Sequence, residues 1–253
     1  IELNPECAEA YFGKGRALAS KREDDKAIQA YDKAIELNPQ YSEAYLAKGI
    51  ALRYKGNQEV AIQLYDKAIK INPNYAEAYY EKGELLQSIG SIKALSGDEE
   101  QSILKYEEAI KELDKAIEIN PNYADAYLRK GITLRLLKKY TEAISVLNKA
   151  IELDDKNTLA YTNKSTCFVK IKKYDEAINT LKKAIEIMPN DGILHYEIAK
   201  VYALMNDSEN AIQNLKRSIE ITYNYIKFTS TEPEFASLRD NEEFKNLLGS
   251  YYR

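Results

Sequence analysis

The chain has 253 residues, of which 45 % are hydrophobic and 30 % are charged, and 36 Lys and Arg against 40 Asp and Glu leave a net charge of −4. This composition is typical of a folded, helix-rich protein and excludes a disordered or collagen-like chain. Because both signs of charge are mixed along the sequence, we expect neither nucleic acid nor a membrane surface as a partner.

The sequence carries no strong targeting signal and no informative cysteine pattern. The sequence lacks both an apolar run of about 18 residues and an opening signal-peptide pattern, so the expected location is cytoplasmic. Cys7 and Cys167 lie far apart and define neither a disulfide framework nor a metal site.

An internal repeat organises the chain. Similar strings end at Pro39, Pro73, Pro121 and Pro189. An Ala-Ile pair recurs at intervals of 34, 48, 34, 34 and 34 residues, starting from Ala27, Ala61, Ala109, Ala143, Ala177 and Ala211. A constant period with one insertion of 14 residues indicates a repeat protein.

Each period contains two helical stripes of alternating large and small residues. In the first period, Tyr11, Gly15 and Leu18 have the spacing of one helix face, and Ala27, Tyr31 and Ala34 have that of a second. Small residues let two backbones approach closely, and Pro39 ends the second helix. Each period is therefore predicted to be a helical hairpin.

This pattern of aromatic, Gly, Leu, Ala, Ala and Pro residues resembles the tetratricopeptide repeat. The resemblance implies an all-α, right-handed α-solenoid, or superhelix, of about six hairpins with a C-terminal capping helix. Ser165 and Ala199 replace the Gly, Asp155 and Tyr223 stand where Pro is expected, and His195 replaces the aromatic residue.

The repeats are assigned in chain order. Residues 1–5 read as the end of a preceding repeat, from which we expect a further repeat or domain upstream. Six repeats follow, at residues 6–39, 40–73, 74–121, 122–155, 156–189 and 190–223. Residues 224–253 are predicted to form capping helices, with Asp240 and Glu243 at capping-box spacing.

The insertion falls in the third repeat, at about Ser91 to Leu104. Fourteen residues are two heptads, so each helix of the hairpin gains about two turns and the facing stripes stay in register. Gly90 inside the first helix is expected to destabilise it by about 1 kcal/mol relative to Ala. The longer hairpin is either a neutral length variant or a projection that contacts a partner.

Candidate catalytic groups are few. His195 occupies an aromatic position of its repeat, and neither cysteine has a base close to it in the sequence. The segment from Gly13 to Gly15 lacks the strand and the spacing of a phosphate-binding loop. We therefore expect no enzyme activity, no cofactor and no metal.

By the same resemblance, the ligand surface is the free face of each first helix. The residues predicted to line this groove are Phe12, Arg16, Leu46, Ile50, Arg53, Tyr80, Glu84, Leu128, Arg129, Ile132, Arg135, Thr162, Tyr196 and Lys200. Their apolar members either await a partner or are buried between repeats.

Family members that bind chaperone C-termini grip two carboxylates with Lys and Asn side chains one turn apart on the first helix. The corresponding pairs here are Phe12/Arg16, Leu46/Ile50, Tyr80/Glu84 and Leu128/Ile132, so that clamp is missing. The sequence instead predicts an extended or helical peptide with apolar anchors, steered by arginines toward acidic residues. The other interpretation is that Glu81 and Glu84 neutralise those arginines internally.

The leading functional prediction is a non-catalytic scaffold for protein–protein interaction that binds a protein or peptide partner in the groove. One alternative is self-assembly into homo-oligomers through exposed repeat ends or the longer hairpin. Another is a regulatory array attached to an upstream enzyme or sensor domain.

Overall fold

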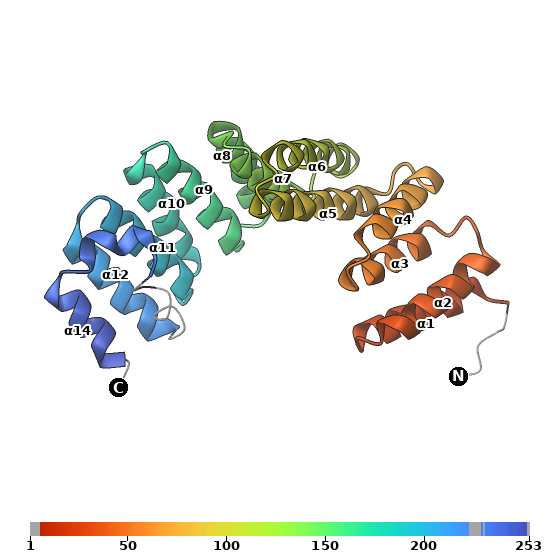
Figure 1. Ribbon diagram of the computed structural model, residues 1–253, viewed down its shortest axis with the longest axis horizontal. Helices are drawn as coiled ribbons and strands as arrows, with labels where there is room; N and C mark the ends of the chain where they lie inside the picture. Colours follow the sequence, from red (N-terminus) through yellow and green to blue (C-terminus); the bar gives the residue numbers. More distant parts are fainter. Residues whose placement is uncertain (1–5, 223–228, 230, 252–253) are drawn as a thin grey trace. The chain divides into compact units, whose positions relative to one another are not determined.

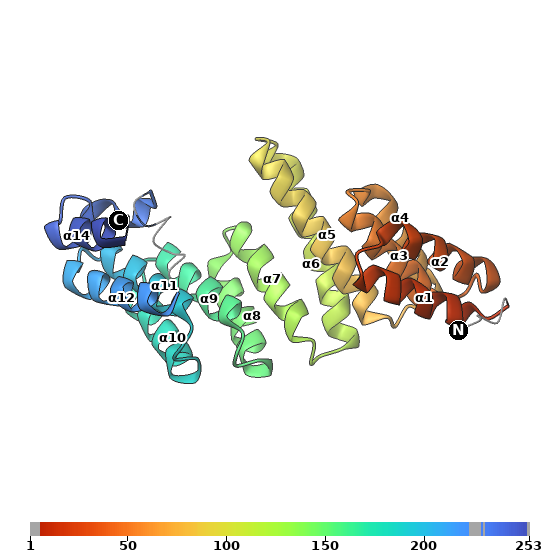
Figure 2. The ribbon, with the colours of Figure 1, turned by 90° about the horizontal axis from the view of Figure 1, so that it is seen from below.

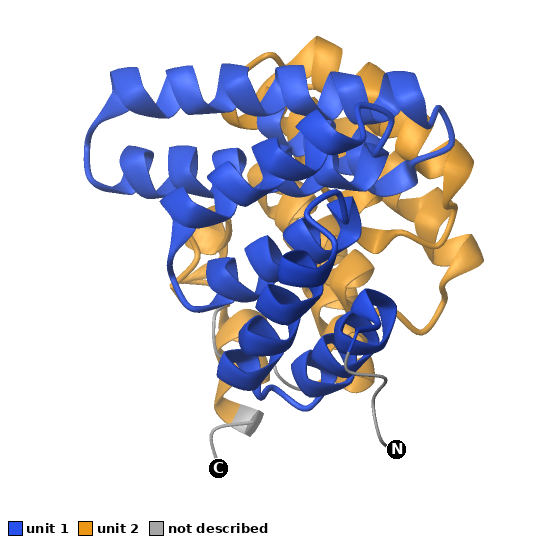
Figure 3. Cartoon of the chain, turned by 90° about the vertical axis from the view of Figure 1, so that its right-hand side faces the viewer, with its two compact units in different colours: residues 1–133 blue, residues 134–253 orange. Residues whose placement is uncertain are grey.

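A computed structural model describes residues 6–222, 229 and 231–251, and every regular element in these residues is a helix. The predicted remnant at residues 1–5 and the start of the predicted cap, residues 224–228, lie outside the described residues. The chain divides into two compact units, residues 1–133 and residues 134–253 (Figure 3).

The first unit consists of stacked antiparallel helical hairpins (Figures 1 and 2). Its helices are α1 (Ala8–Ser20), α2 (Asp24–Leu37), α3 (Ser42–Tyr54), α4 (Gln58–Ile71), α5 (Ala76–Leu95), α6 (Glu99–Ile119) and the larger part of α7 (Ala124–Leu136). Helices of 13 or 14 residues are marginally stable alone in water, so each depends on burying its small and aromatic stripe against neighbours.

The second unit continues the same arrangement. Its helices are α8 (Tyr140–Leu153), α9 (Thr158–Lys170), α10 (Tyr174–Ile187), α11 (Gly192–Leu204), α12 (Ser208–Ile221), the 3₁₀ helix η2 (Pro233–Leu238) and α14 (Glu242–Tyr251). Cys167 is fully buried in α9, as expected of a small core residue.

The two helices of a hairpin approach closely at a position that recurs from repeat to repeat. A Cβ atom on Gly15 would lie 2.4 Å from the Tyr31 ring, and one on Gly49 would lie 2.6 Å from the Tyr65 ring. Both tyrosines are buried. Each ring occupies the space that a side chain on the facing glycine would need.

The turn inside each hairpin contains a residue with left-handed backbone geometry. Gly56 and Gly97 have φ angles of 85° and 82°. Non-glycine residues with φ between 60° and 61° take this position in the other hairpins: Arg22, Lys138, Lys172 and Asn206. Glycine adopts such angles freely and asparagine tolerates them, so the turns at Arg22, Lys138 and Lys172 carry local strain.

The third hairpin is longer than its neighbours, with 20 residues in α5 and 21 in α6. Figure 2 shows α5 and α6 extending past the ends of α3 and α4. Asp98 begins α6 by accepting a hydrogen bond from the N–H of Gln101 at 3.3 Å. The extension exposes large apolar side chains: Ile92, Leu95, Ile103 and Leu104.

The C-terminal segment covers the last apolar face of the second unit. Phe235, Leu238, Phe244 and Leu247 are buried in one cluster with Leu215 of α12. The start of α14 is capped by Asn241, which accepts hydrogen bonds from the N–H groups of Glu243 at 2.9 Å and Phe244 at 3.1 Å. The predicted cap at Asp240 was therefore wrong by one residue, because the backbone turn presents the Asn241 amide to the helix end.

Candidate functional site

The first unit has two separate hollows on the first-helix side, and each contains residues predicted to line the groove. We name the first the Arg16 pocket, with a volume of about 370 Å³. Its lining comes from α1, α3 and the start of α5: Phe12, Arg16, Glu43, Leu46, Ala47, Ile50, Tyr75 and Glu77.

Apolar and aromatic side chains form the walls of the Arg16 pocket. The Phe12 ring lies 5.0 Å from the Tyr41 ring, centroid to centroid. Leu46 is 2 % exposed and forms the floor, whereas Ile50 is half-buried. Burial raises the pKa of Tyr75, so its phenol stays neutral at physiological pH. The pocket thus combines apolar and aromatic side chains with charged ones.

Arg16 supplies the positive charge of this pocket. It is exposed, and its guanidinium lies 5.9 Å from the centroid of the Phe12 ring. Among the described residues, no carboxylate forms an ion pair with Arg16. The side chain is therefore available to an acidic group from outside.

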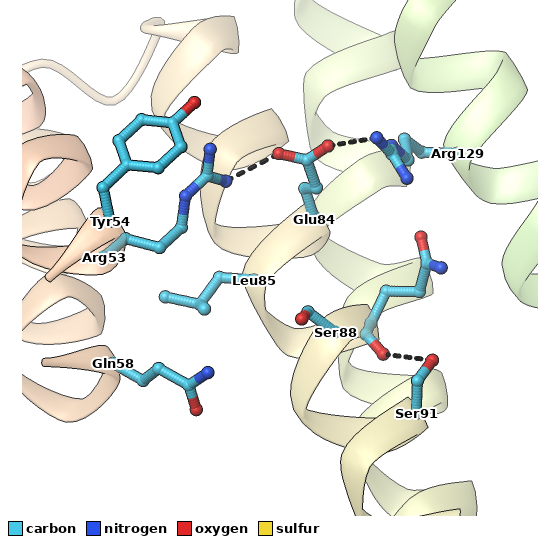
Figure 4. A pocket seen from close by; sticks show the side chains of 9 residues that line it. Arg53, Tyr54, Gln58, Glu84, Leu85, Ser88, Ser91 and Arg129 are labelled. Atoms are coloured by element: carbon cyan, nitrogen blue, oxygen red, sulfur yellow. Dashed lines mark hydrogen bonds and ion pairs between the residues drawn. The ribbon is translucent and has the colours of Figure 1, made fainter. Parts of the chain in front are cut away.

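We name the second hollow the Gln87 pocket, with a volume of about 440 Å³ (Figure 4). It lies where α5 continues past the end of α3. Its lining is Arg53, Tyr54, Gln58, Glu84, Leu85, Gln87, Ser88, Ser91 and Arg129.

The charges around the Gln87 pocket are paired internally. Arg53 forms ion pairs with Glu81 at 2.9 Å and with Glu84 at 2.6 Å, and Arg129 pairs with the other oxygen of Glu84 (Figure 4). Burial raises the pKa of Glu81 to about 7, although Arg53 opposes this shift. Arg53 and Arg129 are thus neutralised by Glu81 and Glu84, and the prediction that they steer an acidic partner does not hold for them.

Several other predicted groove residues contact the chain itself. The Tyr80 ring lies 5.0 Å from the Tyr123 ring, and Leu128 is buried. One of the two interpretations of the apolar groove residues was that they are buried within the chain. This interpretation holds for Leu46, Leu128 and Tyr196. The other apolar residues are half-buried: Phe12, Ile50, Tyr80 and Ile132.

In the second unit, polar groove residues also have partners. The Arg135 Nε donates a hydrogen bond to Asn163 Oδ1 at 2.9 Å. The Thr162 hydroxyl donates to the carbonyl of Leu159 at 3.2 Å. Arg135 is therefore held by a neutral amide and not by a carboxylate.

The C-terminal segment covers the last two predicted groove residues. The Tyr196 ring packs edge-on against Phe235, with centroids 5.6 Å apart. Lys200 forms ion pairs with Glu197 at 3.3 Å and with Glu232 at 3.4 Å. The expectation that these two residues face a partner is therefore corrected, because residues after α12 fold back onto α11.

Two tyrosines that were not among the predicted groove residues contact predicted groove aromatics, and a third lines the Arg16 pocket. Tyr41, Tyr75 and Tyr123 each stand two residues after the proline that ends the preceding repeat. This recurrent Pro-x-Tyr pattern was a signal that could have identified them. Gln87 lies on the same helix face as Tyr80 and Glu84, so its spacing placed it on the predicted groove surface, although it was not among the predicted groove residues.

Neither a metal site nor a membrane span is found in the described residues. Within the described residues, no group of three His, Cys, Asp or Glu side chains could hold a metal ion. His195 Nδ1 lies 3.3 Å from Asn214 Oδ1 in a contact between the two helices of its hairpin. Each described helix is too short or too polar to span a lipid bilayer.

Family models match most of the chain. Models described as tetratricopeptide repeat or TPR repeat match residues 8–41, 30–63, 49–90, 168–206 and 194–225. The chain is a tetratricopeptide repeat protein. A model of anaphase-promoting complex, cyclosome, subunit 3 matches residues 103–184. A search among curated proteins gives no match.

Solved structures agree with this assignment. YrrB, a tetratricopeptide protein with an unusual peptide-binding site, is 25 % identical, with a TM-score of 0.58 over 79 % of this chain and 95 % of that one. MamA is 27 % identical, with a TM-score of 0.58 over 71 % of this chain and 90 % of that one.

A chain of the APC/C hetero-tetramer Cut9–Hcn1 is 20 % identical, with a TM-score of 0.65 over 95 % of this chain and 44 % of that one, and shows the fold alone. The predicted all-α solenoid of tetratricopeptide hairpins is confirmed.

Proposed function

We propose that this tetratricopeptide protein is a non-catalytic scaffold that binds a peptide segment of a protein partner in the Arg16 pocket. The observation that carries the proposal is an exposed arginine that forms no ion pair with a carboxylate of the described residues, beside a floor and walls formed by Leu46, Ile50 and Phe12. Apolar anchors supply affinity, and a charge at the rim supplies orientation and speed of association.

The proposed ligand is an acidic side chain flanked by apolar residues. The carboxylate pairs with Arg16, and the apolar neighbours lie against Phe12 and Ile50. Glu43 and Glu77 also line the pocket and disfavour a second acidic residue in the ligand.

The test uses a displayed library of random peptides of about 12 residues, selected on the full chain. We expect the selected peptides to share an acidic residue next to large apolar residues. Arg16→Glu should lower the affinity for a selected peptide by about tenfold. Raising the salt concentration should lower the affinity of the wild-type chain for the same peptide.

Lys14→Glu is the matched control, since it makes the same charge change on an exposed residue of α1 that does not line the Arg16 pocket. It should leave the affinity within about twofold of wild type. Selected peptides without acidic residues, or equal losses in both variants, would count against the proposal.

Self-assembly is the second candidate, and the exposed apolar tip of the third hairpin favours it. Leu95 is 90 % exposed, and Ile92, Ile103 and Leu104 are exposed close to it in the same hairpin. Apolar clusters of this kind often mark interfaces. Light scattering over a range of concentrations, with Leu95→Ser as the variant, tests it: a mass that stays monomeric in the wild type excludes this candidate.

A further inference from the structure

The Gln87 pocket contains a buried polar group without a partner. Gln87 is 8 % exposed, and its side-chain Oε1 is buried and accepts no hydrogen bond from the described residues. Buried carbonyl groups are nearly always paired, since an unpaired one is destabilising. An exception that lines a pocket therefore points to a missing hydrogen-bond donor.

The amide of Gln87 can reach a ligand with little rearrangement. The last torsion of a glutamine side chain is broad and roughly two-fold, so the amide turns easily. The backbone that carries it is fixed, because the Ser91 hydroxyl donates to the Gln87 carbonyl at 3.1 Å and contacts the Tyr106 hydroxyl at 3.2 Å. The helix that carries Gln87 is therefore rigid, whereas the amide at the end of the side chain can rotate.

The electrostatics of this pocket favour an uncharged ligand. The two cationic residues in its lining, Arg53 and Arg129, are both paired with Glu84, and Arg53 also with Glu81. A carboxylate ligand would have to displace Glu84 and could not donate to Gln87. An ammonium ligand would find no unpaired carboxylate in this lining, because Glu84 already pairs with both arginines.

The remaining groups match a peptide main chain with an apolar side chain. Gln58 and Ser88 add further donors and acceptors to the lining. The Tyr54 ring is 72 % exposed at the edge and is held by the Arg53 guanidinium, 5.1 Å from its centroid. The ring offers a rigid apolar face next to these polar groups.

We propose that the Gln87 pocket is a second peptide-binding site, which takes an uncharged segment of extended main chain. A peptide N–H donates to Gln87, Gln58 and Ser88 exchange hydrogen bonds with the neighbouring peptide groups, and an apolar side chain rests on Tyr54. This site is separate from the Arg16 pocket and does not depend on the function proposed for that pocket.

Three blocked leucine derivatives test the charge and donor arguments by NMR titration of the full chain. The probes are N-acetyl-leucine N-methylamide, which is neutral, N-acetyl-leucine, which is a carboxylate, and leucine N-methylamide, which is an ammonium. We expect the neutral probe to shift the signals of Gln58, Gln87 and Ser88 with a millimolar Kd, and the charged probes to bind there at least about fivefold more weakly.

Gln87→Met keeps the length of the side chain and removes its amide. It should lower the affinity for the neutral probe by at least about fivefold. The matched control is Gln63→Met, the same change at an exposed position of α4, which should have no effect. If Gln87→Met does not fold, Tyr54→Ala carries the same test, because that ring is already exposed.

The proposal is overturned if the carboxylate or the ammonium probe binds at Gln87 as tightly as the neutral one. It is also overturned if the variants that fold bind like wild type, or if no probe shifts these signals. Because binding at the Arg16 pocket is read from signals of Phe12 and Arg16, failure at one site is distinguished from failure at the other.

Discussion

Gly90 of α5 lies directly against the ring of Tyr106 in α6: a Cβ atom on this glycine would be 2.8 Å from both Cδ1 and Cε1 of the ring. Both residues are buried. They repeat, within the lengthened hairpin, the relationship of Gly15 to Tyr31 and of Gly49 to Tyr65. Gly90 is thus required by packing, although considered alone in a helix it is unfavourable.

Substituting this glycine tests the packing. Gly90→Ala should destabilise the chain by about 1–2 kcal/mol, because overpacking outweighs the gain in helix propensity. Gly13→Ala, in α1, is the control: nothing lies within 4 Å of its added Cβ, so it should stabilise by about 0.5–1 kcal/mol. Urea unfolding followed by circular dichroism measures the change in the free energy of unfolding for both variants. If Gly90→Ala stabilised the chain, the close approach would be refuted.

The strained turn at Lys172 gives a second prediction. Its φ of 61° is unfavourable for a residue with a side chain. Lys172→Gly should therefore raise the free energy of unfolding by about 0.5–1 kcal/mol, after the greater flexibility of glycine in the unfolded chain is subtracted.

The reverse change should have the opposite sign. Gly56→Ala, at a φ of 85°, should lower the free energy of unfolding by about 1 kcal/mol. The midpoint of thermal unfolding measures both variants, and midpoints that shift in the same direction would argue against backbone strain as the cause.

The raised pKa of Glu81 predicts that the stability of the chain depends on pH. Its pKa is about 7 in the folded chain, raised from 4.5 by burial, so the folded state binds the proton more tightly than the unfolded state. The contribution of Glu81 to stability is full below about pH 4.5 and is lost as the pH rises through about 7.

The size of this loss should be about 3 kcal/mol. Glu81→Gln cannot titrate, so the difference between wild type and variant should change across this range. Urea midpoints at about pH 5 and about pH 8 measure it, and parallel pH profiles for the two proteins would disprove the assignment.

The C-terminal segment supplies a fourth prediction. Phe235 is fully buried against Tyr196, so Phe235→Ala should destabilise the second unit by about 3–5 kcal/mol. Hydrogen exchange should then accelerate in α11 and α12, and much less in α1 to α4 of the first unit. Uniform acceleration throughout the chain would contradict the local role given to this cap. Ser237→Ala is a milder control, since it removes one hydrogen bond, to the carbonyl of Ala203 at 3.0 Å.

The sequence by itself determined the helices, their pairing into hairpins and the family. These depend on residues close in the chain: the spacing of Gly15 and Tyr31 within one hairpin fixes how its helices approach. A repeated local pattern therefore predicts a repeated local structure. The bounds of the individual repeats stay a prediction.

The tertiary structure decided which side chains of the predicted groove are available. Arg16 and Arg53 look alike in the sequence, yet Arg53 pairs with Glu81 and Glu84, whereas Arg16 has no such partner among the described residues. Tyr196 and Lys200 are covered by a segment outside the regular repeats. Ion pairs and buried contacts depend on distances between side chains of different helices to within about an ångström, and the repeat period does not specify those distances.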